Sequence, residues 1–265
     1  MVRDALLAAH GWDDNAIEIR PVVATGDRIQ DRALAEVGGK ALWTKELDAA
    51  LMAGDIDFSV HSMKDVETVR PEHLSIVAML PRADVRDRLV GSPSLDALPK
   101  GARIGSSAPR RRAQLLRIRP DLEVVLFRGN VQTRLAKLES GEVSATLLAS
   151  AGLERLGMHD TGVCLPTSLL LPAPSQGAIG IEALAGNGQV CNWLAAINHE
   201  QTYACVSSER ALLAGLEGDC RSPVAALATM ADGMIHIDAE IYSPDGSQIE
   251  CGAATFSAGS SDARA

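Results

Sequence analysis

Apolar and polar residues alternate with two different periods in the first part of the chain, and these periods predict strands separated by a helix. Residues 56–60 alternate at period two, as a half-buried strand does, and residues 74–80 form a second apolar run. Residues 42–51 carry apolar side chains at helical spacing and end at Gly54, a plausible C-cap. A further strand is expected over residues 17–23. This βαβ rhythm predicts an α/β domain.

The same rhythm restarts after residues 81–87, a charged segment with a proline that is expected to act as a hinge. Three strands are expected, each followed by a helix. The strands lie within residues 103–107, 122–127 and 145–149, and the helices within residues 110–116, 131–138 and 150–156. Because these strand ends face the same way, residues 84–172 are expected to form a second α/β domain with one polar, basic edge.

The last third of the chain changes character. Residues 177–182 are expected to return as a strand to the first domain, which then combines residues 1–80 and 177–196. Two helices and three antiparallel strands are expected to follow, at residues 190–197, 207–216, 224–228, 234–241 and 249–256, with a turn at 244–246. These elements predict a small α+β third domain over residues 200–265.

The composition is that of an ordinary soluble protein. The length of 265 residues is enough for two or three domains with their own cores. Of these residues, 46% are apolar and 22% are charged, which is typical of globular proteins. No apolar run approaches the roughly 18 residues of a membrane span, and the chain is expected in the cytoplasm. A net charge of −9 and 3% aromatic residues disfavour binding to nucleic acid or to a membrane surface. Any anionic ligand must therefore be held by a local basic cleft.

Two titratable residues, Lys64 and Asp65, come just after the strand predicted at 56–60. In open α/β sheets ligands bind outside the carboxyl ends of the strands, so this pair is well placed for chemistry. A surface ion pair is the simpler interpretation of a Lys-Asp dipeptide taken alone. The recurrence of polar and basic residues at other strand ends favours a functional site.

Arginines gather at the strand ends of the second domain. Arg110 and Arg111 lie in the first turn of a helix, where cations oppose the helix dipole, so helix stability does not explain them. Arg128 follows a strand end, and Arg134 lies in the next helix. Each arginine alone is more often a solvated surface residue. Together they predict a site for carboxylates or phosphates, which guanidinium groups bind in a bidentate manner.

The five cysteines are odd in number and form no CxxC pair, so they indicate neither a disulfide framework nor a zinc site. Cys220 is distinctive because it lies in an acidic, glycine-containing loop, residues 216–223, at the entry to the third domain. A lone cysteine is usually a buried, inert thiol, but such a loop is a poor place to bury one. Cys220 is therefore a candidate functional residue.

Five motifs, in order along the chain, carry a resemblance to a known family. They are GGKALWTKELD at 38–48, HSMKDV at 61–66, RGNVQTRLAKL at 128–138, PSQGAIGIE at 174–182 and LEGDC at 216–220. Together they closely resemble the porphobilinogen deaminase (hydroxymethylbilane synthase) family, colinearly from about residue 2 to about residue 256. The resemblance implies two α/β domains like those of periplasmic binding proteins around a cleft, plus the small third domain.

The resemblance also implies a transferase that joins four porphobilinogen units into hydroxymethylbilane and releases ammonia. Family members build this chain on a dipyrromethane cofactor, held by a thioether to the cysteine that corresponds to Cys220. Asp65 matches the carboxylate that stabilises the cationic azafulvene stage and moves protons. The residues that match the cofactor- and substrate-binding positions are Asp27, Ser62, Lys64, Ser107, Arg110, Arg111, Arg128, Arg134, Arg155 and Gln176. The family is also expected to be monomeric and to need no metal.

The chain departs from the family at both ends. It starts at Met1 inside what resembles the helix after the family's first strand, and it stops at Ala265 where relatives continue into a closing helix. An N-terminal strand with an Arg-x-Ser-Pro-Leu-Ala segment is therefore expected to be missing. Two alternatives to the active enzyme stay open: a truncated, catalytically impaired homologue, and an anion-binding two-domain module.

Overall fold

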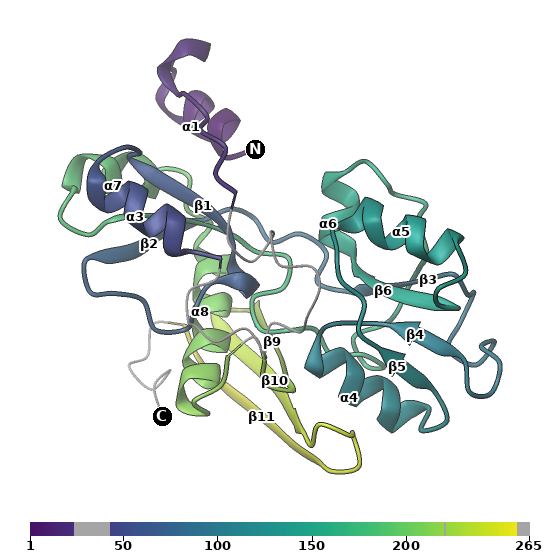
Figure 1. Ribbon diagram of the computed structural model, residues 1–265. Helices are drawn as coiled ribbons and strands as arrows, with labels where there is room; N and C mark the ends of the chain where they lie inside the picture. Colours follow the sequence, from purple (N-terminus) through teal and green to yellow (C-terminus); the bar gives the residue numbers. More distant parts are fainter. Residues whose placement is uncertain (24–42, 220, 259–265) are drawn as a thin grey trace.

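The computed structural model describes residues 1–23, 43–219 and 221–258, and their strands form three separate sheets (Figure 1). Each sheet lies within one of the three domains expected from the sequence, and the boundaries of those domains stay predictions. Asp27 and Cys220 lie outside the described residues. No helix in the described ranges is long and apolar enough to cross a membrane.

The first sheet has the order β1-β8-β2, and both outer strands run antiparallel to the central one. Its strands are β1 (Phe58–Ser62), β8 (Ile179–Leu184) and β2 (Leu74–Met79). Its helices are α1 (Val2–His10), α3 (Lys45–Ala53) and α7 (Gly188–Ala195), and short 3-10 turns cover η1 (Asp14–Ala16) and η2 (Met63–Asp65). Leu6, Ile181 and Leu194 are central to the apolar core that α1 and α7 share with the sheet.

Four sequence expectations for this unit meet different outcomes. The predicted strand at 74–80 and the helix that ends at Gly54 are confirmed, and Gly54 has the left-handed conformation of a C-cap. The strand expected at 17–23 is wrong, because those residues pair with no strand in the described part of the chain. Strand β1 exists, but Val60 is exposed while Ser59 and His61 are buried, because His61 contacts the buried Glu182 carboxylate of β8 and Ser59 hydrogen bonds to His61.

The second sheet has the order β5-β4-β6-β3-β7 and is mixed. Its strands are β3 (Asp87–Val90), β4 (Arg103–Gly105), β5 (Glu123–Val125), β6 (Ala145–Ala149) and β7 (Val163–Cys164). Strand β4 pairs in parallel with β5 and β6, so the expected shared edge of three strand ends is confirmed. In Figure 1, α4 (Pro109–Ile118) lies on one side of the sheet, and α5 (Val131–Glu139) and α6 (Ser150–Arg155) lie on the other. Leu89, Ile104, Leu115 and Leu147 form the centre of its core.

The third sheet, β11-β10-β9, is fully antiparallel, as the alternating pattern predicts. Its strands are β9 (Val224–Ala231), β10 (Met234–Tyr242) and β11 (Ile249–Ser257), and α8 (Glu200–Gly215) packs on them. The turn between β10 and β11 lies against α4. Gly246 has φ of 72°, and a Cβ there would come within 2.2 Å of the Ala113 carbonyl oxygen, so this contact between units requires glycine.

One buried carboxylate, that of Glu209 on α8, connects the segments that run between the sheets. Arg82 donates from Nη1 and Nη2 to the two Glu209 oxygens, at 2.7 and 3.0 Å. The backbone N–H groups of Ser175 and Ala228 donate to the same carboxylate, at 2.6 and 2.7 Å. Glu209 is 0% exposed. The segments between the first and second sheets that contain Arg82 and Ser175, and strand β9 of the third sheet, are therefore joined by hydrogen bonds to one buried carboxylate.

Substituting Glu209→Gln is expected to lower the free energy of unfolding by about 3–5 kcal/mol, because Arg82 would stay buried without its counter-charge. Urea denaturation at neutral pH measures this loss. Glu200→Gln, at the exposed start of the same helix, is the matched control and is expected to cost less than about 1 kcal/mol. Equal, small losses for both variants would contradict the role assigned to Glu209.

Candidate active site

A cavity of about 190 Å³ lies where the turn after β1 meets the edge of the second sheet. Three residues expected from the sequence line it together: Lys64, Arg111 and Arg134. Gly129, Asn130 and Ala149 are also part of the lining. The cavity thus combines a lysine from the first sheet's side with arginines from two helices of the second.

Local sequence explains why the second sheet presents these groups. The turn between β5 and α5 contains Gly129, whose φ of 119° suits glycine, and a Cβ there would lie 2.6 Å from the Thr133 side chain. Asn130 then caps α5, since its Oδ1 accepts the Thr133 N–H at 2.9 Å. Arg134 folds back from α5 and donates from Nε to the Gly129 carbonyl at 2.9 Å. The turn and its helix therefore fix the Arg134 guanidinium at the cavity wall.

The cavity concentrates positive charge. Burial lowers the pKa of the Lys64 ammonium; neighbouring Asp65 opposes that shift, and Arg111 adds to it. Burial, together with the charges of Arg111 and Arg128, lowers the pKa of Arg134 to about 10. A lowered pKa on a basic group means that its surroundings disfavour its charge. An anion in the cavity would offset this penalty.

A second buried carboxylate, Asp87 at the start of β3, holds the two arginines of α4. Asp87 Oδ2 accepts from Arg110 Nη2 at 2.8 Å, and Oδ1 accepts from Arg111 Nη2 at 2.7 Å. Gln176 Nε2 also donates to Oδ1 at 2.8 Å. Asp87 is 1% exposed; burial alone would raise its pKa, but the two guanidinium groups outweigh it and hold the pKa well below the usual range.

Arg110 and Arg111, which the sequence predicts as part of a site for carboxylates or phosphates, bind a carboxylate of the protein itself. They are 4% and 6% exposed, and both are paired with Asp87. Arg111 still lines the cavity, whereas Arg110 donates from Nη1 to the Leu171 carbonyl and is not part of the lining. The Nε of Arg110 is buried and has no hydrogen-bond partner among the described residues.

Sequence reasoning missed Asp87, which it placed in the charged hinge. The available signal was a carboxylate two residues before the apolar pair Leu89 and Val90, since a charge at the start of a buried strand needs partners.

The other described residues that the sequence predicts for the site are not among the residues lining the cavity, and they differ in burial. Ser62 ends β1, and Asp65 ends the η2 turn beside Lys64; both are half-buried. Arg128 is buried directly before Gly129. Ser107 is exposed between β4 and α4, and Arg155 is exposed at the end of α6, where it donates to the Gly177 carbonyl at 2.9 Å.

Comparisons with known proteins agree with the motifs. One family model, the dipyromethane cofactor binding domain of porphobilinogen deaminase, matches residues 1–192, and the porphobilinogen deaminase C-terminal domain matches residues 203–262. The chain is 63% identical over 252 residues to porphobilinogen deaminase of Sphingopyxis alaskensis, and 49% identical over 250 residues to that of Paracoccus denitrificans. Each alignment covers 93% of this chain and 80% of the relative.

Among solved structures, substrate binding domain 2 of Lactococcus lactis GlnP, in an open conformation, is similar with a TM-score of 0.42 and 11% identity. That comparison covers 82% of this chain and 78% of the other.

Substituting Asp87→Asn is expected to lower the free energy of unfolding at pH 7 by about 3–5 kcal/mol, because two buried guanidinium groups lose their counter-charge. The folded pKa of Asp87 lies below its unfolded value of about 3.9, so its stabilising effect is complete above that pH and is lost as the pH falls further. Urea denaturation of both proteins should therefore show a difference that narrows below about pH 4.

Asp96→Asn, at an exposed position, is the control, and it is expected to change stability by no more than about 0.5 kcal/mol at either pH. A difference between wild type and Asp87→Asn that stays constant from pH 7 to pH 3 would show that the Asp87 charge is not what holds the arginines.

Proposed function

This chain belongs to the porphobilinogen deaminase family, and we propose that it is a transferase that joins four porphobilinogen molecules head to tail into hydroxymethylbilane, releasing ammonia at each addition. The observation that carries this proposal is the cavity where Lys64, Arg111 and Arg134 meet. Every pyrrole ring of the substrate bears an acetate and a propionate. Ammonium and guanidinium groups are the side chains suited to bind such carboxylates by charge-assisted hydrogen bonds.

A covalently attached dipyrromethane fits the same residues. We propose a thioether to Cys220, and carboxylates held by Lys64, Arg111 and Arg134. The cavity wall supplies these cations, and no carboxylate of the described residues forms an ion pair with Arg134. When bound, the group supplies the anchor on which the pyrrole chain is extended. Arg128, Arg155, Ser62, Ser107 and Asp27 stay predicted contacts.

Arg110 and Gln176 are assigned an indirect role in ligand binding instead of direct contact with the ligand. Both bond to Asp87, and neither is among the residues of the cavity lining. We infer that they act on ligand binding through Asp87, by keeping its carboxylate and the Arg111 guanidinium in place.

The proposed catalytic group is the carboxylate of Asp65. As ammonia leaves porphobilinogen, positive charge develops on the pyrrole ring, and a fixed carboxylate beside the ring nitrogen would stabilise it. The same carboxylate can accept and return protons as ammonia departs and the ring α-proton is lost. Its position beside Lys64, which lines the cavity, supports this assignment.

We also propose that the protein works in the cytoplasm and as a monomer. Four cysteines of the described chain are unpaired thiols, which suits a reducing compartment: Cys164, Cys191, Cys205 and Cys251. The cavity draws its lysine and arginines from one chain, so a second copy is not needed to assemble them.

The cofactor provides the test of the whole proposal. Intact-mass spectrometry of the purified protein is expected to show a mass above that of the polypeptide, and Ehrlich's reagent should give a red colour. Cys220→Ser is expected to lose both signals, while Cys251→Ser, which changes an exposed thiol on β11, keeps them. An unmodified wild-type mass with no colour would overturn the enzyme and favour the impaired homologue or the anion-binding module.

Asp65→Asn is expected to keep the fold and reduce turnover by about 10²–10⁴-fold, because the amide neither balances positive charge nor accepts a proton. Porphobilinogen consumption is compared at equal Ehrlich colour, so that only loaded protein is counted. Asp57→Asn, at an exposed position directly before β1, is expected to behave like wild type. Wild-type turnover in Asp65→Asn would remove Asp65 from the mechanism.

A further inference from the structure

We propose that Arg70 is a positioning residue for the turn that carries Lys64 and Asp65, and that it acts through Glu67, Asp48 and Glu182. This inference rests on the proposed function, since the turn matters through the chemistry assigned to Asp65. Arg70 is not among the residues that line the cavity. Its effect must therefore pass through the loop of which it forms the end.

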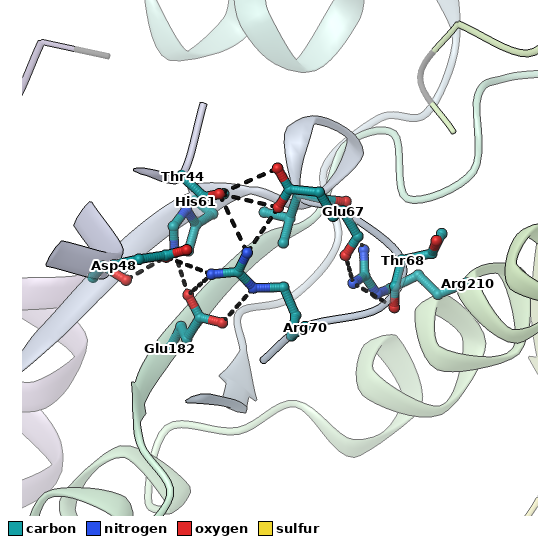
Figure 2. A network of polar contacts seen from close by, with 10 residues as sticks. Thr44, Asp48, His61, Glu67, Thr68, Arg70, Glu182 and Arg210 are labelled. Carbon is teal, nitrogen blue, oxygen red and sulfur yellow. Dashed lines mark hydrogen bonds and ion pairs between the residues drawn. The ribbon is translucent and has the colours of Figure 1, made fainter. Parts of the chain in front are cut away.

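The Arg70 guanidinium uses all of its N–H groups, of which arginine has five (Figure 2). Nε and Nη2 donate to the two Glu182 oxygens at 2.8 and 3.0 Å. The second Nη2 bond goes to Asp48 at 2.5 Å. Nη1 donates to Glu67 at 2.7 Å and to Thr44 at 3.2 Å. A lysine ammonium has three donors and no planar fork, so it cannot reproduce this set.

These partners come from separate elements of the first sheet's unit. Glu182 lies on the central strand β8, and Asp48 lies in α3, whose N-cap is Thr44. Glu67 belongs to the loop itself, two residues after Asp65. Arg70 thus fastens the loop to a strand and a helix that are both part of the folded core.

The start of the loop is fixed by other contacts. The Met63 N–H donates to the Ala178 carbonyl at 3.1 Å, and the Met63 side chain is fully buried. Between the two ends, Arg210 of α8 donates to the carbonyls of Val66, Glu67 and Thr68, at 3.1, 2.5 and 3.3 Å (Figure 2). The segment from Met63 to Arg70 is therefore fixed at its start by Met63, at its end by Arg70 and between them by Arg210.

Arg70 supplies the positive charge that neutralises the acidic residues of this cluster. Three carboxylates, those of Asp48, Glu67 and Glu182, converge on it. Burial opposes the charge of Arg70, but hydrogen bonds to Glu182 and Asp48 outweigh it and raise its pKa, so it stays protonated. Without Arg70 the carboxylates would repel one another, and Glu67 is the one on a loop that can move away. Movement of Glu67 displaces Asp65.

A purely structural role is the competing explanation, because removing any buried charge destabilises a protein. Arg119 provides the matched comparison. It is a half-buried arginine that donates to Asp121 at 2.7 and 2.8 Å and to the carbonyls of Leu95 and Leu98, but it lies at the far end of α4 and not on the cavity. Arg119→Met should destabilise the protein without disturbing the turn.

The experiment compares Arg70→Met, Arg70→Lys and Arg119→Met as cofactor-loaded proteins, well below their melting temperatures. Because a displacement of about 1 Å in a catalytic group can cost about 10²-fold in rate, Arg70→Met is expected to lose about 10²-fold in kcat, with KM changed less than about threefold. Arg70→Lys is expected to lie between Arg70→Met and wild type. Arg119→Met should keep kcat within about twofold of wild type at a lower melting temperature.

Hydrogen-exchange mass spectrometry of residues 63–69 gives a readout that needs no activity. Exchange there is expected to accelerate in the Arg70 variants and to match wild type in Arg119→Met. If Arg70→Met does not fold, Arg70→Lys carries the comparison. Wild-type kcat and exchange in the Arg70 variants would overturn the inference while leaving the proposed function intact. A wild-type protein with neither cofactor nor turnover would instead show that the proposed function is wrong, and this inference with it.

Discussion

Two guanidinium groups, those of Arg110 and Arg111, lie buried against the single carboxylate of Asp87, and this arrangement decides which positive charges remain for a ligand. Buried cations at a helix N-terminus are unfavourable twice, through desolvation and through the helix dipole. Asp87 offsets both penalties, so the first turn of α4 can stay packed beside the cavity. Asp65 and Asp87 offset only part of the burial penalty of Lys64, and Arg134 gains no such offset from Asp87, so both basic groups keep lowered pKa values that an anion in the cavity would counteract.

A second buried carboxylate, that of Glu209, stabilises the segments that connect the sheets in the same way. Glu209 and Asp87 hold neighbouring residues of the returning segment, Ser175 and Gln176. Ser175 has φ of 67°, a left-handed conformation that disfavours a residue with a Cβ, and its N–H bond to Glu209 helps to maintain it. Buried polar contacts with fixed geometry, rather than one continuous apolar core, therefore set how β8 enters the first sheet beside the cavity.

Sequence periodicity predicts most of the strands and helices because it reports which faces are buried. It fails at residues 17–23, where the pattern is present but no strand in the described chain pairs with it. It predicts the strand β1 but not which of its faces is buried, since buried His61 contacts Glu182, 121 residues away in the sequence. Such partners are invisible in a local pattern. The same limit explains why the motifs identified Arg111 and Arg134 but not the dependence of Arg111 on Asp87.

A crystal structure of the protein after incubation with porphobilinogen tests the central claim most directly. The account predicts density for a pyrrole chain continuous from the Cys220 sulfur into the cavity, with its carboxylates on Lys64, Arg111 and Arg134 and the Asp87 bonds to Arg110 and Arg111 retained. Density for the chain elsewhere on the molecule, or Arg111 released from Asp87 to reach the ligand, would contradict it.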